Sequence, residues 1–242
     1  MIRDRQRVRR PSARRGVASF RRAALSLSAC VLAAVSVPAH AVDGKAKAIA
    51  AEKPPVLSLK DALLHDAASP VVGNPDGDIT IVAFVDYNCP FCRKSEADLA
   101  ALIDGDPKIR VIYKDWPILS KTSVAAAKVA IAANWQGKYA QMHQALMRLK
   151  ARPVDDATLG QAAVAAGVDI ARLNKDLDEH DGEIVALLKR NIQEADALGL
   201  KGTPVYLIGP FITASPLDLP QFKKIVADAR EDLAHPGTPA QP

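Results

Sequence analysis

The chain has 242 residues, and its 32 Lys and Arg residues outnumber its 27 Asp and Glu residues. Nine of the basic residues and one of the acidic residues precede residue 42, which leaves 23 basic and 26 acidic residues in the remainder. The net positive charge therefore belongs to the start of the chain and gives no argument for nucleic-acid binding. The remainder has the size of one domain, or of one domain that carries an insertion.

Residues 1–41 have the pattern of a cleaved signal peptide. The arginine-rich start is followed by an uncharged stretch, Ala23–Val37, which is shorter than the about 20 apolar residues that a membrane-spanning helix needs. The segment ends in Pro38-Ala39-His40-Ala41, whose small residues predict cleavage after Ala41. We therefore predict a periplasmic or otherwise exported protein.

Two other export signals overlap this segment. Leu27-Ser28-Ala29-Cys30 resembles a lipoprotein cleavage box in which Cys30 carries the lipid. Only the uncharged residues Ala23–Ala29 separate this box from Arg22, and apolar residues continue past it, so the ordinary signal peptide is favoured. Phe20-Arg21-Arg22 resembles a twin-arginine signal, but its flanking residues fit that signal poorly.

The hydrophobic pattern of the remaining chain predicts an α/β protein. After a flexible lead-in at 42–56, the pattern favours a short helix at 59–66, a turn at 74–78, a strand at 79–85, a helix at 90–103 and a strand at 109–114. Helices are predicted over 120–199. They are followed by a strand at 204–208, which pairs with 211–213, and by a helix at 219–233. This order predicts a thioredoxin-like domain at 57–119 and 200–233, with an inserted helical domain at 120–199. Residues 234–242 are predicted to be a disordered tail.

Cys89-Pro90-Phe91-Cys92 lies where the strand at 79–85 meets the next helix. Unpaired N–H groups at the start of a helix stabilise a thiolate, so Cys89 is predicted to be the nucleophile of thiol–disulfide exchange. Cys92, one turn further, is predicted to be more buried and to resolve the mixed disulfide formed at Cys89. Pro90 stiffens the turn. Phe91 cannot donate a hydrogen bond to the thiolate, so we expect Cys89 to be less acidic than beside a histidine.

Other uses of the Cys pair fit the sequence less well. A pair two residues apart closes almost no loop, and no other cysteine follows residue 41, so a structural disulfide is disfavoured. A zinc site would need more ligands, and the histidines are scattered along the sequence (His40, His65, His143, His180 and His235). Two thiolates can hold Cu(I), which stays an alternative. We predict no metal and no organic cofactor, because the sulfurs themselves carry the electrons.

A second motif, Gly202-Thr203-Pro204, stands at the start of the strand at 204–208. Proline is disfavoured at the head of a central strand. We therefore predict a cis Thr203–Pro204 bond in a loop that packs against the Cys pair. The backbone of Thr203 would then pair with an extended substrate chain.

Several polar residues near these motifs have a functional and a structural interpretation. Asp86 either assists proton transfer during exchange or is a solvated carboxylate at the strand end. Lys114 and Asp115 are predicted to form a surface pair. Tyr139 and His143, four residues apart on one helix, are predicted to be residues at the edge of the core rather than ligands.

Three segments resemble those of the exported DsbA-like thiol:disulfide oxidoreductases, in the branch of the ScsC-type and BdbD-type proteins. They are Phe84-Val85-Asp86-Tyr87-Asn88-Cys89-Pro90-Phe91-Cys92, Tyr113-Lys114-Asp115-Trp116-Pro117-Ile118-Leu119 and Gly202-Thr203-Pro204, within a similarity that spans about residues 57–232. The resemblance implies a thioredoxin fold with an inserted helical domain, a redox-active Cys89/Cys92 pair and a cis-Pro204. The best-known oxidase has His where this chain has Phe91, and Val where it has Thr203, which argues against a role as oxidase alone.

We predict an exported enzyme that forms, reduces or isomerises disulfides in client proteins. The candidate site residues are Cys89 and Cys92 for catalysis, Pro90, Phe91, Thr203 and Pro204 for substrate binding and support, and Asp86 for proton transfer. Expected partners are cysteine-containing clients and a membrane redox partner that reoxidises or reduces the pair, and no nucleic acid. The alternative is a Cu(I)-binding or chaperone-like periplasmic protein whose Cys pair is not turned over. The direction of electron flow and the oligomeric state stay open.

Overall fold

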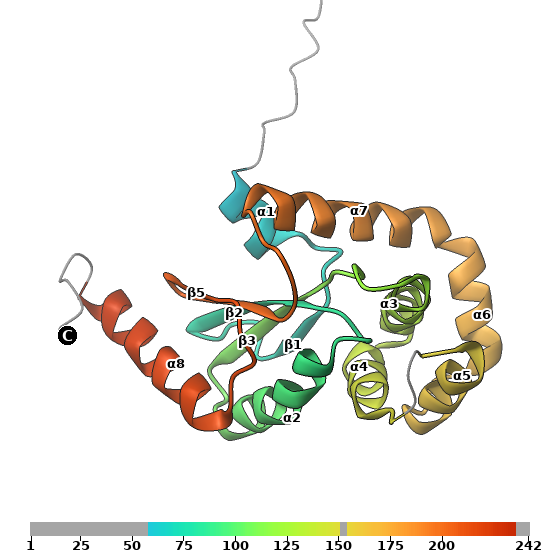
Figure 1. The fold of residues 1–242 in the computed structure, drawn as a ribbon, viewed down its shortest axis with the longest axis horizontal. Coiled ribbons are helices and arrows are strands. Elements are labelled where there is room, and N and C mark those ends of the chain that lie inside the picture. Colours follow the sequence, from blue (N-terminus) through green and yellow to red (C-terminus); the bar gives the residue numbers. More distant parts are fainter. Residues whose placement is uncertain (1–57, 151–153, 236–242) are drawn as a thin grey trace, which may run out of the picture. The chain divides into compact units, whose positions relative to one another are not determined.

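The computed structural model describes residues 58–150 and 154–235, which form a mixed α/β structure (Figure 1). The predicted signal peptide, the lead-in at 42–56 and residues 236–242 of the predicted tail lie outside the described residues. Helix α8 (Leu219–Ala234) includes the first residue of the segment predicted as the tail. Among the described residues, no helix is long and apolar enough to cross a membrane.

A mixed sheet with the strand order β1-β3-β2-β4-β5 organises the described residues. Its strands are β1 (Val71–Gly73), β2 (Ile79–Val85), β3 (Ile109–Asp115), β4 (Val205–Ile208) and β5 (Phe211–Thr213). β2 and β3 run parallel and are joined through α2 (Pro90–Gly105), which confirms the predicted β-α-β unit. β4 pairs antiparallel with β2, and β5 pairs antiparallel with β4, so the predicted hairpin is also confirmed.

The edge strand β1 is absent from the sequence prediction. It follows Pro70 and pairs antiparallel with β3, with Val71 opposite Ile112. A strand of three residues is too short to show the alternation of apolar and polar residues by which strands are found in a sequence. Its pairing with β3 specifies it instead.

Helices cover both faces of the sheet (Figure 1). α1 (Leu59–His65) and α7 (Asp181–Ala197) lie against one face, and α2 and α8 lie against the other. Between β3 and β4 the chain forms α3 (Lys121–Ala133), a 3₁₀ helix (Asn134–Gln136), α4 (Tyr139–Arg148), α5 (Asp156–Ala165), α6 (Ile170–Glu179) and α7. These helices fill the segment predicted as the helical insertion, and α7 returns to pack against β3 and α1.

Local signals in the sequence explain where these helices begin and end. Side-chain oxygens of Ser120, Asp155 and Asp218 accept hydrogen bonds from backbone N–H groups in the first turns of α3, α5 and α8. Gly199, with a φ of 69°, follows the end of α7, where a left-handed backbone is needed to close the last turn. These caps keep the boundaries of the helical segment close to those that the periodicity predicts.

The apolar core is divided between the two faces of the sheet, because the side chains of a strand alternate. Ile81, Ala83 and Val85 of β2 pack with residues of α2 and α8, whereas Val82 and Phe84 pack with residues of α1 and α7. Both sets are buried. This is why β2 has a continuous apolar run from Ile81 to Val85 in the sequence.

The predicted surface pair of Lys114 and Asp115 is wrong, because both side chains are buried. Lys114 lies on the α1/α7 face, where its Nζ is 2.9 Å from Oε2 of Glu194. Asp115, as the next residue of β3, lies on the opposite face, where the Tyr139 hydroxyl donates to its Oδ2 at 3.1 Å. Charged residues at the end of a strand are normally exposed, and here the returning helices bury both of them.

Candidate active site

The Cys pair lies at the junction of β2 and α2, as the sequence predicts. β2 ends at Val85, and Cys89 is the N-cap of α2, followed by Pro90 as its first residue. The backbone N–H of Cys92 donates to Cys89 Sγ at 3.4 Å. Both cysteines are free thiols and both are buried, with exposed fractions of 3% for Cys89 and 1% for Cys92.

Because their surroundings differ, the two thiols have pKa values that are shifted in opposite directions. The pKa of Cys89 is lowered to about 6, chiefly because the thiol of Cys92 donates a hydrogen bond to its thiolate. Burial opposes this lowering, and the side chain of Thr203 and the backbone N–H groups of Cys92 and Phe91 add to it. Burial raises the pKa of Cys92 far above its usual range, and the negative charge of Cys89 raises it further. At neutral pH the pair therefore holds one thiolate, on Cys89, and one thiol, on Cys92.

The second motif packs against Cys89. The Thr203–Pro204 bond is cis, and the Thr203 carbonyl oxygen lies 3.2 Å from Cys89 Sγ, so both parts of that structural prediction are confirmed. Pro204 itself is buried, whereas Phe91 is 56% exposed. Apolar surface beside the motif is thus supplied by Phe91 and not by Pro204. The substrate-binding roles assigned to these residues and to Pro90 stay predictions.

Asp86 is a buried structural acceptor in the segment between β2 and Cys89. Its side chain is 1% exposed, so the interpretation as a solvated carboxylate is wrong. One carboxylate oxygen accepts from the backbone N–H of Asn88 at 2.8 Å, and the other accepts from the N–H of Leu119 at 3.0 Å. These bonds fix the loop before Cys89. A part in proton transfer stays a prediction.

Asn88, which the sequence analysis does not single out, joins the loop before Cys89 to the helical segment. Its Nδ2 lies within hydrogen-bonding distance of three hydroxyl groups at the start of α3, those of Ser120, Thr122 and Ser123, at 3.0–3.1 Å. Its Oδ1 accepts from the backbone N–H of Val154, just before α5, at 3.0 Å. Asparagine has both donor and acceptor groups, so one side chain can bridge the two segments.

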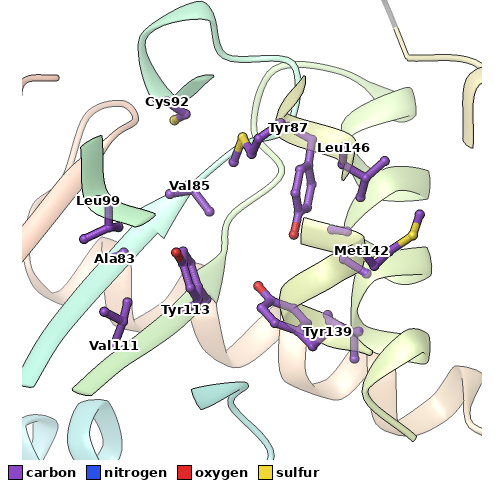
Figure 2. Close-up of a cluster of buried hydrophobic side chains, with 14 of the residues drawn as sticks. Ala83, Val85, Tyr87, Cys92, Leu99, Val111, Tyr113, Tyr139, Met142 and Leu146 are labelled. Atoms are coloured by element: carbon purple, nitrogen blue, oxygen red, sulfur yellow. The ribbon is translucent and has the colours of Figure 1, made fainter. Parts of the chain in front are cut away.

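A buried polar cluster, formed by Tyr87, Glu96, Tyr113 and His143, lies beside the Cys pair. The Tyr87 hydroxyl and His143 Nδ1 share a hydrogen bond of 2.9 Å, and the Tyr113 hydroxyl donates to Glu96 Oε1 at 3.2 Å. His143 Nε2 lies 3.1 Å from Glu96 Oε2, close enough for an electrostatic contact but without the alignment of a hydrogen bond. Figure 2 shows the hydroxyl groups of Tyr87 and Tyr139 directed toward one another, and the hydroxyl of Tyr113 directed toward the side of Val85 and Leu99.

Arg93, one residue after Cys92, makes a second connection to α4. Its Nε donates to the carbonyl of Tyr87 at 2.9 Å, and its Nη1 contacts the carbonyl of Leu149 at the end of α4. Tyr87 is therefore held through its hydroxyl by α4 and through its carbonyl by α2.

Part of this cluster has a signal in the sequence. Tyr139 and His143 are recognised there as neighbours on one helix face, and the structure buries both, with exposed fractions of 3% and 1%. Their partners could not be found from that spacing, because Tyr87 precedes His143 by 56 residues. The spacing of Cys92 and Glu96, four residues apart in the same helix, is the one local signal that places a carboxylate on the Cys92 side of α2.

Among the described residues, no group of three or more His, Cys, Asp or Glu side chains is arranged to hold a metal ion.

Comparison with known proteins gives the family. The family model described as Thioredoxin matches residues 65–228. The chain belongs to the thioredoxin superfamily. The match includes the Cys pair and the cis-proline loop, and it spans the helices between β3 and β4 as well.

Solved structures place this thioredoxin-superfamily chain among the DsbA-like proteins. A thioredoxin-like oxidoreductase from Silicibacter pomeroyi is 36% identical, with a TM-score of 0.67 over 71% of this chain and 98% of that chain. The thiol-disulfide exchange protein α-DsbA2 of Wolbachia pipientis is 29% identical, with a TM-score of 0.66 over 70% and 90%. The catalytic domain of Proteus mirabilis ScsC is also 29% identical, with a TM-score of 0.63 over 70% and 93%. These matches support a thiol–disulfide oxidoreductase as the general class.

The curated relatives that match this thioredoxin-superfamily chain are named as Na(+)/H(+) antiporters. Na(+)/H(+) antiporter NhaA 1 of Mycolicibacterium gilvum is 28% identical over 155 residues, which are 60% of this chain and 25% of that protein. The chain thus spans about a quarter of the length of the curated relatives that it matches. Their name describes those whole proteins.

Proposed function

We propose that this protein is an exported thiol:disulfide oxidoreductase that acts on the cysteines of other proteins through Cys89. The observation that carries the proposal is the contrast between the two thiols: Cys89 has a pKa of about 6, whereas burial keeps Cys92 protonated. Thiolates are the attacking species in disulfide exchange. A pair with one ready nucleophile and one protonated resolving thiol is therefore suited to exchange and a poor structural crosslink.

The exchange step balances on the two sulfurs alone. In the oxidising direction, a client thiolate attacks Cys89 Sγ of the oxidised pair, the Cys89–Cys92 bond breaks, and Cys92 leaves with the bonding electrons and takes up a proton. A second client thiolate then attacks the client sulfur of the mixed disulfide and releases Cys89 as a thiolate. The client loses two electrons and two protons, of which one proton stays on Cys92 and the other goes to solvent. Reduction of a client disulfide is the same sequence in reverse.

Exposed apolar side chains around the motif support binding of unfolded client segments. Phe91 is 56% exposed, and Ile118 and Leu119 are 42% and 52% exposed in the loop that bonds to Asp86. Exposed apolar side chains of this kind can bind apolar segments without reading their sequence. The backbone of Thr203, next to Cys89, would pair with the backbone of such a segment.

The acidity of Cys89 supports a moderate redox potential. A pKa of about 6 lies between the values of about 7 for thioredoxin and about 3.5 for DsbA. A more acidic nucleophile stabilises the reduced pair and makes the disulfide more oxidising. We therefore expect a reduction potential between about −270 and about −120 mV, which suits isomerisation or mild oxidation of clients.

Export and partners are part of the proposal. The signal-peptide pattern of residues 1–41 supports export, as does the likeness to a periplasmic thioredoxin-like protein from Salmonella enterica, which is 28% identical with a TM-score of 0.64. In such a compartment a membrane redox partner would return the Cys pair to its working state. Client proteins with exposed cysteines are the substrates.

The test is to trap the intermediate. We expect a Cys92→Ala variant, incubated at pH 8 with a disulfide-containing client, to form a mixed disulfide at Cys89, detected by non-reducing electrophoresis and mass spectrometry. The matched control is Cys89→Ala, which should form no adduct. An absence of adduct while Cys89 still reacts with iodoacetamide would contradict the proposal. A chaperone-like protein would instead bind its client equally well after loss of both cysteines, and a Cu(I)-binding protein would bind Cu(I) through the pair but form no mixed disulfide.

A further inference from the structure

The loop before Cys89 is held by residues that follow β3. In residues 86–88, each side chain has a hydrogen-bond partner further along the chain. Leu119 donates to the first residue, His143 bonds to the second, and Val154 donates to the third. Two of these partners belong to the helical segment between β3 and β4. The position of Cys89 therefore depends on helices that lie outside the β-α-β unit that carries it.

His143 makes the most buried of these contacts. Its Nδ1 is 2.9 Å from the Tyr87 hydroxyl, and its Nε2 is 3.1 Å from Glu96 Oε2. The imidazole ring lies 4.1 Å from the ring of Tyr113 and stacks at 5.7 Å on the ring of Tyr139, measured between centroids. The side chain is 1% exposed. Packed in this way, the ring can turn only if its neighbours move.

The two polar partners of His143 flank the Cys pair on both sides. Tyr87 stands two residues before Cys89, in the loop that follows β2. Glu96 stands four residues after Cys92, one turn further along α2 on the same side of the helix. One side chain from α4 therefore contacts both the incoming loop and the helix that the Cys pair begins. Arrangements of this kind fix the relative position of two elements that meet at a reactive group.

We propose that His143 is a positioning residue that holds the sulfur of Cys89 against the first turn of α2. The proposal rests on the proposed function, because position matters here through the reactivity of the thiolate. Cys89 Sγ is 3.4 Å from the Cys92 N–H nitrogen and 3.2 Å from the Thr203 carbonyl. Stabilisation of a charge by the start of a helix falls off within the first turn, so a small displacement of the loop weakens it.

The test measures the thiolate of Cys89 directly. In the reduced protein, the rate of alkylation by iodoacetamide is followed against pH, and the midpoint gives the apparent pKa of Cys89. We expect His143→Leu to raise this midpoint by about one unit, a tenfold change in the protonation equilibrium. An unchanged midpoint in a folded His143→Leu protein would overturn the proposal.

A packing control separates positioning from general loosening of the core. Leu146 lies on α4 close to His143, is fully buried and has no polar contact to lose. Leu146→Ala should destabilise the protein through a cavity. We expect it to leave the midpoint of Cys89 unchanged. Equal shifts in Leu146→Ala and His143→Leu would mean that α4 is only a packing element, and would overturn the proposal.

A second variant tests whether His143 acts through its hydrogen bond to Tyr87. It also keeps the proposal testable if His143→Leu does not fold. Tyr87→Phe removes only the hydroxyl that bonds to His143. We expect it to raise the midpoint in the same direction, and the double variant to shift it no further than His143→Leu alone, since contacting residues are not additive. An unchanged midpoint in Tyr87→Phe, or shifts that add fully in the double variant, would overturn the proposal.

This readout separates the proposal from the proposed function. Alkylation needs no client, no redox partner and no turnover. If the unmodified protein exchanges no disulfides but His143→Leu still shifts the midpoint, the proposed function fails and the positioning role stands. If trapping at Cys89 succeeds and the midpoint does not move, the positioning role fails and the proposed function stands.

Discussion

The two faces of the central sheet bury ionisable groups in different ways. On the face covered by α1 and α7, Lys114 is fully buried and pairs with Glu194 at 2.9 Å, with a weaker contact of 3.4 Å to the carbonyl of Ala62. On the face covered by α2 and α8, the hydroxyl of Tyr139 from α4 donates to Asp115, and the polar cluster around His143 continues toward the Cys pair. Neighbouring residues of β3 thus enter two unlike environments.

The difference shows that a buried charge does not by itself indicate an active site. The charges of Lys114 and Glu194 pair with each other, and helices α1 and α7 cover them. A pair of this kind ties helices to a sheet. The cluster on the other face is linked by hydrogen bonds to Tyr87, beside the nucleophile. We therefore expect changes to the ion pair to alter stability alone, and changes to the polar cluster around His143 to alter the chemistry of Cys89.

The largest expected effect is on the α1/α7 face. Lys114→Ala leaves the carboxylate of Glu194 buried without its cation, and burial already raises the pKa of that carboxyl. We expect a loss of about 3–5 kcal/mol in the free energy of unfolding, measured with urea. The alkylation midpoint of Cys89 should not change.

The control for this variant replaces both charges. A Lys114→Met and Glu194→Leu double variant removes the pair without leaving an unpaired charge, and we expect it to recover most of the lost stability. A shift in the Cys89 midpoint in either variant would contradict this expectation, because it would show that the two faces of the sheet are coupled.

On the other face, the second largest effect comes from Cys92. The hydrogen bond from its thiol is the main cause of the lowered pKa of Cys89. Cys92→Ala removes the donor and should raise the Cys89 midpoint by about two units, whereas Cys92→Ser keeps an O–H donor and should leave it near 6. Alkylation rates against pH distinguish the two. Equal midpoints would show that the N–H groups of α2, and not the thiol, set the acidity.

Asp115 gives a smaller effect with a defined pH window. Burial raises the pKa of its carboxyl to about 6, above the about 3.9 of an unfolded chain. The folded protein therefore binds more protons between these values, and its stability falls as pH rises from about 4 to 6. Asp115→Asn cannot ionise, so at pH 7 we expect it to be more stable than the unmodified protein by about 1–2 kcal/mol.

The comparison of unfolding curves at pH 4 and pH 7 tests this prediction. The stability difference between Asp115→Asn and the unmodified protein should shrink or vanish at pH 4, where both are uncharged at this position. A difference that does not depend on pH would mean that the amide changes packing or the Tyr139 hydrogen bond rather than removing a charge.

The elements that carry the Cys pair could be predicted closely from the sequence. β2 has the predicted bounds, and β3 and α2 differ from theirs by one and two residues at their ends. Continuous apolar runs bounded by turn residues, together with a Cys pair at a helix start, are local signals. The cis Thr203–Pro204 bond was also predicted, from the conflict between proline and a central strand.

The surroundings of the pair could not be predicted in the same way. Whether Lys114 is exposed depends on where α7 returns, and Glu194 lies 80 residues away in the sequence. The partner of Tyr87 depends on which face of α4 meets the sheet, which periodicity does not specify. Leu119, which donates to Asp86, lies 33 residues further along the chain, and the partners of Asn88 in the helical segment lie 32 residues or more away. Local patterns therefore located the reactive sulfurs, and long-range packing determined what holds them.

The smallest expected effect concerns the exposed surface next to the motif. Phe91→Ser removes an aromatic ring that is 56% exposed beside Cys89, and Ile212→Ser on β5 removes an apolar side chain that is 59% exposed on the edge strand of the sheet. Substitution of exposed side chains changes stability by at most about 0.5 kcal/mol, so both variants should fold normally.

If Phe91 binds clients, Phe91→Ser should raise KM for an unfolded client about three- to tenfold, whereas Ile212→Ser should not. For a small disulfide such as oxidised glutathione, which needs no apolar surface, neither variant should differ from the unmodified protein. Equal losses in both variants would assign client binding to general surface hydrophobicity rather than to Phe91.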